Sequence, residues 1–220
     1  MAAFTVIALP QFSDIAPIAA LATRLTRMSN RQCAGQSANG ATTQPTDPTA
    51  RMWVALHNAH RANHTSTCSV AWDPELANEA MISAQQCQFQ HTNSGKDYGQ
   101  NMGEASQGSK ESSIVSMFYN EIKDFGPYWH QDSVPMTEPS VLHFTQAVWK
   151  TTTTIGCATN NCGQWLLSYC NYRGPGNWAG EYANNVADLI ASPLPPICSE
   201  IGSGAQDGSC ITDQQLLQYF

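Results

Sequence analysis

The hydrophobic and polar positions of the chain follow two different periods, and these separate predicted helices from predicted strands. In four stretches, apolar side chains recur three, four or seven positions apart, which is the spacing of an amphipathic helix that buries one face. Val141, Phe144 and Val148 follow this spacing. The predicted helices start at residue 48, run from 74 to about 89, cover 111–125, and open at 137–139 before continuing to about 149.

The residues at the starts of the first two helices support this assignment. Each begins with an aspartate followed by a proline, Asp47-Pro48 and Asp73-Pro74. An aspartate side chain accepts the free N–H groups of a first helical turn, and proline fits the first helical position because no N–H donor is needed there. Gly126 and Pro127 are expected to end the third helix.

A hairpin follows the fourth helix. Residues 155–158 and 164–172 read as two strands joined by the turn at 159–163. The segment 174–177, Gly-Pro-Gly-Asn, is a second turn in which glycine supplies positive φ angles. Helices before and after a small, mainly antiparallel sheet predict an α+β fold, a three-layer α-β-α sandwich.

The compact domain is expected to cover residues 47–191, with different sequence on either side. Residues 1–46 combine two apolar stretches interrupted by proline with a Gly/Ser/Ala/Asn/Thr-rich linker from Cys33. No Lys or Arg precedes the apolar part, which is the reverse of the usual charge order in a secretory leader. This leaves a degenerate leader or pro-segment, a tail foreign to the natural protein, or part of the fold. Residues 192–220 form a Cys-containing extension with a prolyl linker and a short helical tail.

Composition narrows the class of protein. Eight cysteines in a chain with 12% charged residues favour an oxidising compartment, and the even count favours disulfides. The formal net charge of −7, without a Lys/Arg cluster, argues against a nucleic-acid partner. The chain has no run of 18 apolar residues, so no transmembrane helix is expected.

Three histidines of the first helix, His57, His60 and His64, share one helical face. We interpret this face as polar and solvated, with a metal site as the alternative. Asn63, His64 and Thr65 form an N-glycosylation sequon, which requires a surface position.

Several blocks in order resemble the CAP superfamily, which includes cysteine-rich secretory proteins, venom antigen 5 and pathogenesis-related protein 1. The blocks are HFTQAVWK at 143–150, IGCA at 155–158 and YCNYRGPGNWAGEY at 169–182. LHNAHRAN at 56–63 and YGQNMG at 98–103 extend the match, which covers residues 48–186. The resemblance implies the same α-β-α sandwich and an extracellular location.

The resemblance also implies a cleft lined by His91, Gln100, Glu121 and His143. Gln100 stands where many relatives have glutamate, and the venom antigen branch is similar in this respect. Two imidazoles, a carboxylate and a water form an acceptable Zn²⁺ site, with each histidine neutral and its second nitrogen tied to another group. Because the cleft holds a single acid, we expect Zn²⁺ or another divalent cation to bind weakly.

The cysteines follow the family in part. The resemblance implies the bridges Cys157–Cys170 and Cys87–Cys162. For the remaining four cysteines we favour Cys198–Cys210 and Cys33–Cys68.

Three functions are compatible with the sequence. The first is a secreted, non-enzymatic protein, monomeric or weakly dimeric, that binds a sterol or fatty acid. In this hypothesis Phe125, Tyr128 and Trp129 form an aromatic loop over the ligand, although these rings would equally serve to pack the domain edge. The second is an effector or defence module that binds a host or microbial protein. The third is a metal-dependent hydrolase with Glu121 as base; the chain lacks the Gly-x-Ser-x-Gly, His-Glu-x-x-His and Walker motifs.

Overall fold

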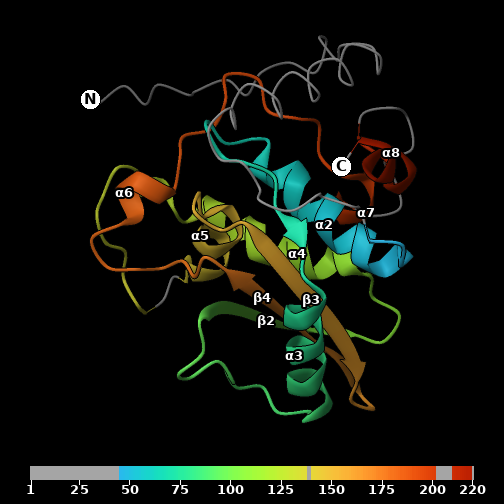
Figure 1. The fold of residues 1–220 in the computed structure, drawn as a ribbon. Coiled ribbons are helices and arrows are strands. Elements are labelled where there is room, and N and C mark those ends of the chain that lie inside the picture. Colours follow the sequence, from blue (N-terminus) through green and yellow to red (C-terminus); the bar gives the residue numbers. More distant parts are fainter. Residues whose placement is uncertain (1–44, 138–139, 202–209, 220) are drawn as a thin grey trace, which may run out of the picture.

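The protein is an α+β sandwich, as the sequence predicts. The computed structural model describes residues 45–137, 140–201 and 210–219. Helix α3 (Pro74–Gln85) covers one face of the sheet, and α2 (Pro48–Arg61), α4 (Glu111–Asn120) and α5 (Leu142–Val148) form the layer on the other face (Figure 1). No helix in the described part of the chain is long and apolar enough to cross a membrane.

The sheet is mixed and mainly antiparallel. Its strand order is β1-β3-β4-β2, with bounds Ala71–Trp72, Thr154–Asn161, Trp165–Arg173 and Tyr98–Ser106. β1 runs parallel to β3, and the other two pairs are antiparallel. The predicted hairpin is confirmed. β3 is longer than predicted because its pairing with β4 continues to Asn161, whereas β4 has the predicted length and lies one residue further along the chain. The strand β2 was not predicted from the sequence.

The starts of the first three predicted helices are confirmed, whereas two helix ends differ from the prediction. The backbone N–H of Ala50 donates to the side chain of Asp47. At the second helix, the backbone N–H groups of Glu75 and Leu76 donate to the side chain of Asp73. Helix α3 ends at Gln85 rather than near 89, because Cys87 adopts a positive φ of 52° that a helix cannot accommodate.

Helix α4 also ends earlier than predicted, at Asn120 rather than 125. Two 3₁₀ turns, η1 (Glu121–Lys123) and η2 (Gly126–Tyr128), follow it. The predicted start of the fourth helix at 137–139 is wrong, because residues 137, 140 and 141 are not helical and α5 begins at Leu142; residues 138 and 139 lie outside the described residues. The shorter helices are α6 (Tyr182–Asn185), α7 (Cys198–Ile201) and α8 (Asp213–Tyr219).

Close packing of α3 on the sheet depends on a glycine. A Cβ added to Gly156 of β3 would lie 2.1 Å from the backbone nitrogen of Ala77 and 2.6 Å from the carbonyl oxygen of Asp73. Both obstacles are backbone atoms, which cannot rotate away. In the second turn, Gly174 has φ of +71° as predicted, while Gly176 has no positive φ and instead lets the chain approach the Trp149 ring.

The C-terminal extension packs against α2. Leu194, Ile197, Ile211 and Leu216 belong to the same buried cluster as Trp53 and Leu56 of α2. His60 Nε2 lies 2.8 Å from Glu200 Oε1, and both side chains are 9% exposed. Figure 1 shows α7 and α8 beside α2.

The prediction of a solvated histidine face on α2 is wrong. His57, His60 and His64 are 1%, 7% and 0% exposed, because α4, the sheet and the C-terminal segment all pack against this helix. Both ring nitrogens of His57 and His64 have hydrogen-bond partners. For His57 these are the carbonyl of Trp53 and the hydroxyl of Tyr172; for His64 they are the carbonyl of Ala187 and the hydroxyl of Tyr119.

Arg61, at the end of α2, is also buried, with 1% of its surface exposed. Its guanidinium donates to four main-chain carbonyls, at 2.7–3.2 Å: those of Cys68, Ala147, Trp149 and Thr152. Two of these carbonyls lie at the C-terminal end of α5. Burial lowers the pKa of Arg61 to about 9, so the side chain remains charged at neutral pH.

We predict that the buried histidines make the fold sensitive to mild acid. Burial lowers the pKa of His57 and of His64 from 6.5 to about 4. Between pH 6.5 and 4 the unfolded chain therefore binds more protons than the folded chain, and the free energy of unfolding falls as pH falls. By pH 4 the loss should be on the order of 3 kcal/mol for each histidine.

Urea denaturation at intervals from pH 7.5 to 4 measures this effect. The double variant His57→Gln, His64→Gln should be less stable at pH 7.5 but should show a much shallower decline with pH. His130→Gln is the matched control, because the His130 side chain is 71% exposed. An equal decline in wild type and double variant would contradict the assignment.

Candidate functional site

The residues expected in the cleft form two hydrogen-bonded pairs. In the first pair, His91 Nδ1 lies 3.1 Å from Gln100 Oε1. Gln100 is on β2 and 8% exposed, whereas His91 is exposed in the loop before that strand. The same amide oxygen accepts the N–H of Thr92, so the loop that carries His91 is fixed to the strand.

The amide nitrogen of Gln100 also has hydrogen-bond partners for both of its donor groups. Its Nε2 donates to Thr92 Oγ1 and to Asn171 Oδ1, at 3.1 and 2.9 Å. Asn171 in turn donates from Nδ2 to the carbonyl of Leu76 in α3. Asn171 thus needs a donor opposite its Oδ1, and Gln100 provides it. Asn171 could not be identified from the sequence, because its role depends on the pairing of β2 with β4.

The second pair is Glu121 with His143. His143 Nδ1 lies 2.6 Å from Glu121 Oε1. The other carboxylate oxygen accepts the backbone N–H groups of His143 and Phe144, at 2.9 and 3.1 Å. The N-cap residue of α5, Val141, makes no side-chain hydrogen bond to the first turn, and Glu121 supplies this cap instead. Glu121 is also the residue at which α4 gives way to the 3₁₀ turn η1.

The first pair includes Gln100 of β2, and the second pair is contacted by the next residue of the strand, Asn101. Successive side chains of a strand point to opposite faces of a sheet. Gln100 contacts the α3 side through Asn171, and the next residue, Asn101, donates to the carbonyl of His143 and to the hydroxyl of Tyr172 on the other side. β2 is an edge strand, so both pairs flank the same edge of the sheet. Asn101 was missed from the sequence, although its place beside Gln100 on a strand is the signal that would have found it.

Both histidines are held in the same tautomer. A glutamine Oε1 and an ionised carboxylate only accept hydrogen bonds, so Nδ1 of His91 and of His143 must each carry the proton. Each Nε2 then presents a lone pair, and no described residue donates a hydrogen bond to it. The His143 side chain is 31% exposed and Glu121 is 16% exposed, so solvent and small ions have access to this pair.

A different group of three potential ligands lies in the core. His57, Cys157 and Cys170 have ligand atoms within 4.8 Å of one another, and among the described residues this is the one such group of His, Cys, Asp or Glu. The two sulfurs are joined in a disulfide, however, and a thiolate is needed to bind a metal. His57 also uses both ring nitrogens in hydrogen bonds. This group therefore does not provide a metal site in the oxidised protein.

The aromatic residues of the expected lipid loop differ in their exposure. Phe125 is 1% exposed and belongs to a buried cluster with Phe144 and Trp149. Trp129 meets Phe125 edge to face, with ring centroids 4.8 Å apart. The placement of Phe125 in a ligand-covering loop is thus wrong, because its ring packs the domain interior. Tyr128 and Trp129 remain half-buried at the rim of this cluster.

Three expected disulfides are present: Cys87–Cys162, Cys157–Cys170 and Cys198–Cys210. The fourth expected bridge involves Cys33, which lies outside the described residues. Asn63 of the sequon is only partly exposed, and its Oδ1 accepts the N–H of Leu194 at 2.7 Å. Its glycosylation stays a prediction, and the contact with Leu194 argues against it.

Comparisons with known proteins agree with the fold. The family model described as the cysteine-rich secretory protein family, CAP, matches residues 54–172. A probable pathogenesis-related protein of Arthroderma benhamiae is 36% identical over 152 residues, which cover 63% of this chain and 48% of the relative. Protein PRY2 of Saccharomyces cerevisiae is 36% identical over 140 residues, which cover 62% and 40%. The chain thus spans about half the length of these curated relatives or less.

Solved structures support the fold. A crystal structure of NaASP2 with Zn²⁺ superposes with a TM-score of 0.56 and 21% identity, covering 67% of this chain and 89% of the other. At this level of identity the likeness concerns the fold.

We predict that Gln100→Glu destabilises the protein. A glutamate keeps the acceptor that faces His91 and Thr92 but removes the donor that faces Asn171 Oδ1. In the present orientation of the Asn171 amide, its Oδ1 then has no donor. If the amide flips, its nitrogen faces the new carboxylate, but its oxygen faces the carbonyl of Leu76, which loses its donor instead. A buried group without its hydrogen bond costs about 1–3 kcal/mol.

Thermal and urea unfolding at pH 7.5, in the presence of a chelator, test this prediction. Gln90→Glu provides the control, since it introduces the same charge at an exposed position of the nearby loop. Unfolding of Gln100→Glu at the wild-type midpoint would mean that the amide of Gln100 is not required by Asn171.

Proposed function

The chain belongs to the cysteine-rich secretory protein family, CAP, and we propose that it is a secreted, non-catalytic binding protein whose His91 and His143 bind a divalent cation. The shared tautomer of these two histidines carries the proposal. Each Nδ1 is fixed by an acceptor, and each Nε2 is left with a lone pair. Zinc-binding histidines have this arrangement, in which the second nitrogen is tied to a carboxylate or carbonyl group.

The chemistry of the donors fits Zn²⁺ without excess charge. Two neutral imidazoles are suitable ligands, and water would complete a tetrahedral set. Glu121 and Gln100 act here as orienting groups for the two rings. The structure of NaASP2, which has the same fold, was obtained with Zn²⁺. The cation would bind and orient a ligand group at the open edge beside β2.

The contacts of Glu121 argue against hydrolysis by this residue. One carboxylate oxygen accepts from the His143 ring and the other accepts two backbone N–H groups. A general base must release a hydrogen bond to take a proton from water. For Glu121 that release would also uncap α5. The positioning role of Glu121 therefore supports the proposal of a non-catalytic protein over the hydrolase hypothesis.

We predict weak, pH-dependent Zn²⁺ binding that requires both histidines. Imidazole binds a metal only when deprotonated, so binding should weaken between pH 7.5 and 5.5. Calorimetric titration of chelator-treated protein should show one site in wild type and none in His91→Ala. His143→Gln, which retains a donor for Glu121, should also lose the site.

Two controls define the site. His130→Gln should bind Zn²⁺ as wild type does, because it removes an exposed imidazole elsewhere. Gln100→Glu should bind about tenfold or more tightly, since a carboxylate beside His91 attracts the cation. Wild-type binding by His91→Ala would refute the proposed site, and binding that appears only after disulfide reduction would instead indicate Cys157 and Cys170.

An apolar ligand is the second candidate, and exposed aromatic surface favours it. Trp178 is a large aromatic side chain that is 60% exposed. The N–H of Gly180 donates to the carbonyl of Asp132 at 2.8 Å, so the segment carrying Trp178 adjoins the loop that follows Trp129. A sterol or fatty acid would lie on this outer surface, beside Tyr128, rather than beneath Phe125.

We predict that the double variant Tyr128→Ala, Trp178→Ala binds labelled cholesterol or palmitate at least several-fold more weakly than delipidated wild type. Trp165→Ala, which removes a 38%-exposed tryptophan from β4, should leave binding unchanged. Equal binding by the double variant would remove this surface from the ligand site. Absence of binding in wild type would defeat the lipid hypothesis and favour a protein-interaction module.

A further inference from the structure

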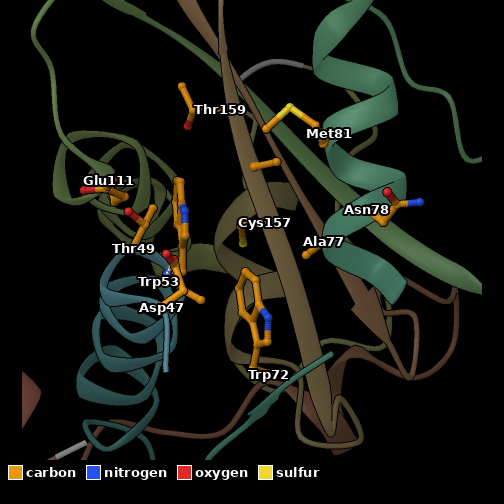
Figure 2. A pocket seen from close by; sticks show the side chains of 12 residues that line it. Asp47, Thr49, Trp53, Trp72, Ala77, Asn78, Met81, Glu111, Cys157 and Thr159 are labelled. Carbon is orange, nitrogen blue, oxygen red and sulfur yellow. Dashed lines mark hydrogen bonds between the residues drawn. The ribbon is translucent and has the colours of Figure 1, made fainter. Parts of the chain in front are cut away.

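A groove lies at the opposite edge of the sheet from the histidine pairs. Its volume is about 460 Å³, and it separates the start of α2 from α3 along β3. Figure 2 shows Trp53 and Trp72 on one side of the β3 ribbon and Ala77, Asn78 and Met81 of α3 on the other. The floor is formed by residues 157–159 of β3. None of the proposed functions uses this groove.

The floor is an unpaired strand edge. β1 pairs with β3 only at Thr154 and Ile155. After Trp72 the chain turns away into α3, so the part of β3 beyond Ile155 has β4 on one side and no described strand on the other. An unpaired edge presents a row of free N–H and C=O groups that another strand can bind.

The register identifies the groups that face the groove. The carbonyl of Ile155 accepts the N–H of Asp73, so Ile155 directs its backbone groups away from β4. Alternate residues of a strand share this direction, which places the N–H and C=O of Cys157 and Thr159 at the open edge. The short Cα–Cα distance of 4.1 Å between Cys157 and Cys170 agrees, since it marks a pair without mutual backbone hydrogen bonds. No described residue bonds these four backbone groups.

A second donor in the groove also lacks a partner. Trp53, which lines the groove, is 1% exposed, and its indole Nε1 makes no hydrogen bond. Buried indole N–H groups are nearly always paired, because desolvating an unpaired donor costs about 1–3 kcal/mol. A carbonyl group entering the groove would supply the missing acceptor.

The charges at the groove favour a basic occupant. Asp47 and Glu111 are among its lining residues, and no lining residue is basic. The indole rings of Trp53 and Trp72 add faces that attract Lys and Arg side chains. On the α3 side the wall is formed by Ala77, Asn78 and Met81, which suit small apolar side chains. The net charge of the chain, −7, acts in the same direction at longer range.

We propose that this groove binds an extended segment of a partner protein, which adds to β3 as a fifth strand and alternates basic with small apolar residues. The backbone of the segment bonds to Cys157 and Thr159, and one of its carbonyls accepts from Trp53 Nε1. Its basic side chains face Asp47, Glu111 and the two indoles, while its apolar side chains face α3. Strand addition takes affinity from the backbone bonds and specificity from these alternate pockets.

The probe is the peptide Ac-Lys-Val-Arg-Val-Lys-NH2, titrated into the full chain labelled with ¹⁵N. We expect the Trp53 indole N–H resonance to shift, and the Cys157 and Thr159 amides to shift and exchange more slowly with solvent. The same peptide with Glu at the three basic positions should bind at least tenfold more weakly. Two N-methylated forms of the peptide are compared, the first methylated on both valines and the second on arginine. Only one of these forms should lose binding, because only every second N–H group of the peptide faces β3.

Protein variants test the edge and the charges separately. Thr159→Pro removes an outward N–H but no bond of the β3–β4 ladder, and should weaken binding at least tenfold. Thr159→Val is its control, because both variants lose the hydroxyl contact with Ser168. Asp47→Asn with Glu111→Gln keeps the helix cap and should weaken binding several-fold, with a smaller dependence on salt.

The outcomes are decisive in either direction. Peptide binding that leaves the Cys157 and Thr159 amides unprotected, or that Thr159→Pro does not weaken, would overturn the proposal. Shifts at Trp53 with palmitate but not with the peptide would assign the groove to a lipid instead. His91→Ala should bind the peptide as wild type does, so failure of the zinc proposal leaves this test unaffected.

Discussion

The burial of Arg61 is the constraint on which the helical layer depends. A guanidinium removed from water needs full hydrogen bonding, and among the described residues no carboxylate reaches Arg61. Four backbone carbonyls take that role instead, from the loop after α2, from the end of α5 and from the segment that leads into β3. The carbonyl end of α5 carries the negative pole of the helix dipole, which favours the positive charge. Lysine could not replace this side chain, because a single ammonium cannot reach four carbonyls in a planar fork.

The polar core connects this constraint to the histidine pairs. Arg61 holds the C-terminal end of α5, and Glu121 caps its N-terminal end while orienting His143. From α2, His57 bonds the hydroxyl of Tyr172, which also accepts from Asn101. Asn101 donates to the carbonyl of His143. Histidine 143 is thus positioned from both ends of its helix and from the sheet, so its ring direction is a property of the whole layer rather than of its local sequence.

The sequence predicted those features that depend on near neighbours. The Asp-Pro helix starts, the hairpin and the buried face of α5 each rest on residues within one turn or one strand of each other, and all are present in the structure. The strand β2 was missed because Gly99 and Gly103 weaken its pattern, and pairing with β4 is what fixes it. The burial of His57 and Arg61 was missed because their partners lie about 90 to 115 residues away in the chain. Family resemblance, rather than spacing, selected His91, Gln100, Glu121 and His143.

Each edge strand of the sheet has backbone groups that no neighbouring strand pairs, and the surroundings of the two edges differ. At the β2 edge, the side chains of Gln100 and Asn101 bond to the backbone of the preceding loop and of α5, and each nearby histidine keeps an Nε2 that no described residue bonds. At the β3 edge, β1 is only two residues long, and the helices on either side leave a groove over the unpaired backbone. An open edge normally invites aggregation, which short edge strands and nearby charges suppress. In the proposed complex α2 and α3 flank the added strand, and Asp47 and Glu111 restrict which strand is accepted. The same geometry that protects this edge from unspecific pairing thereby makes it selective.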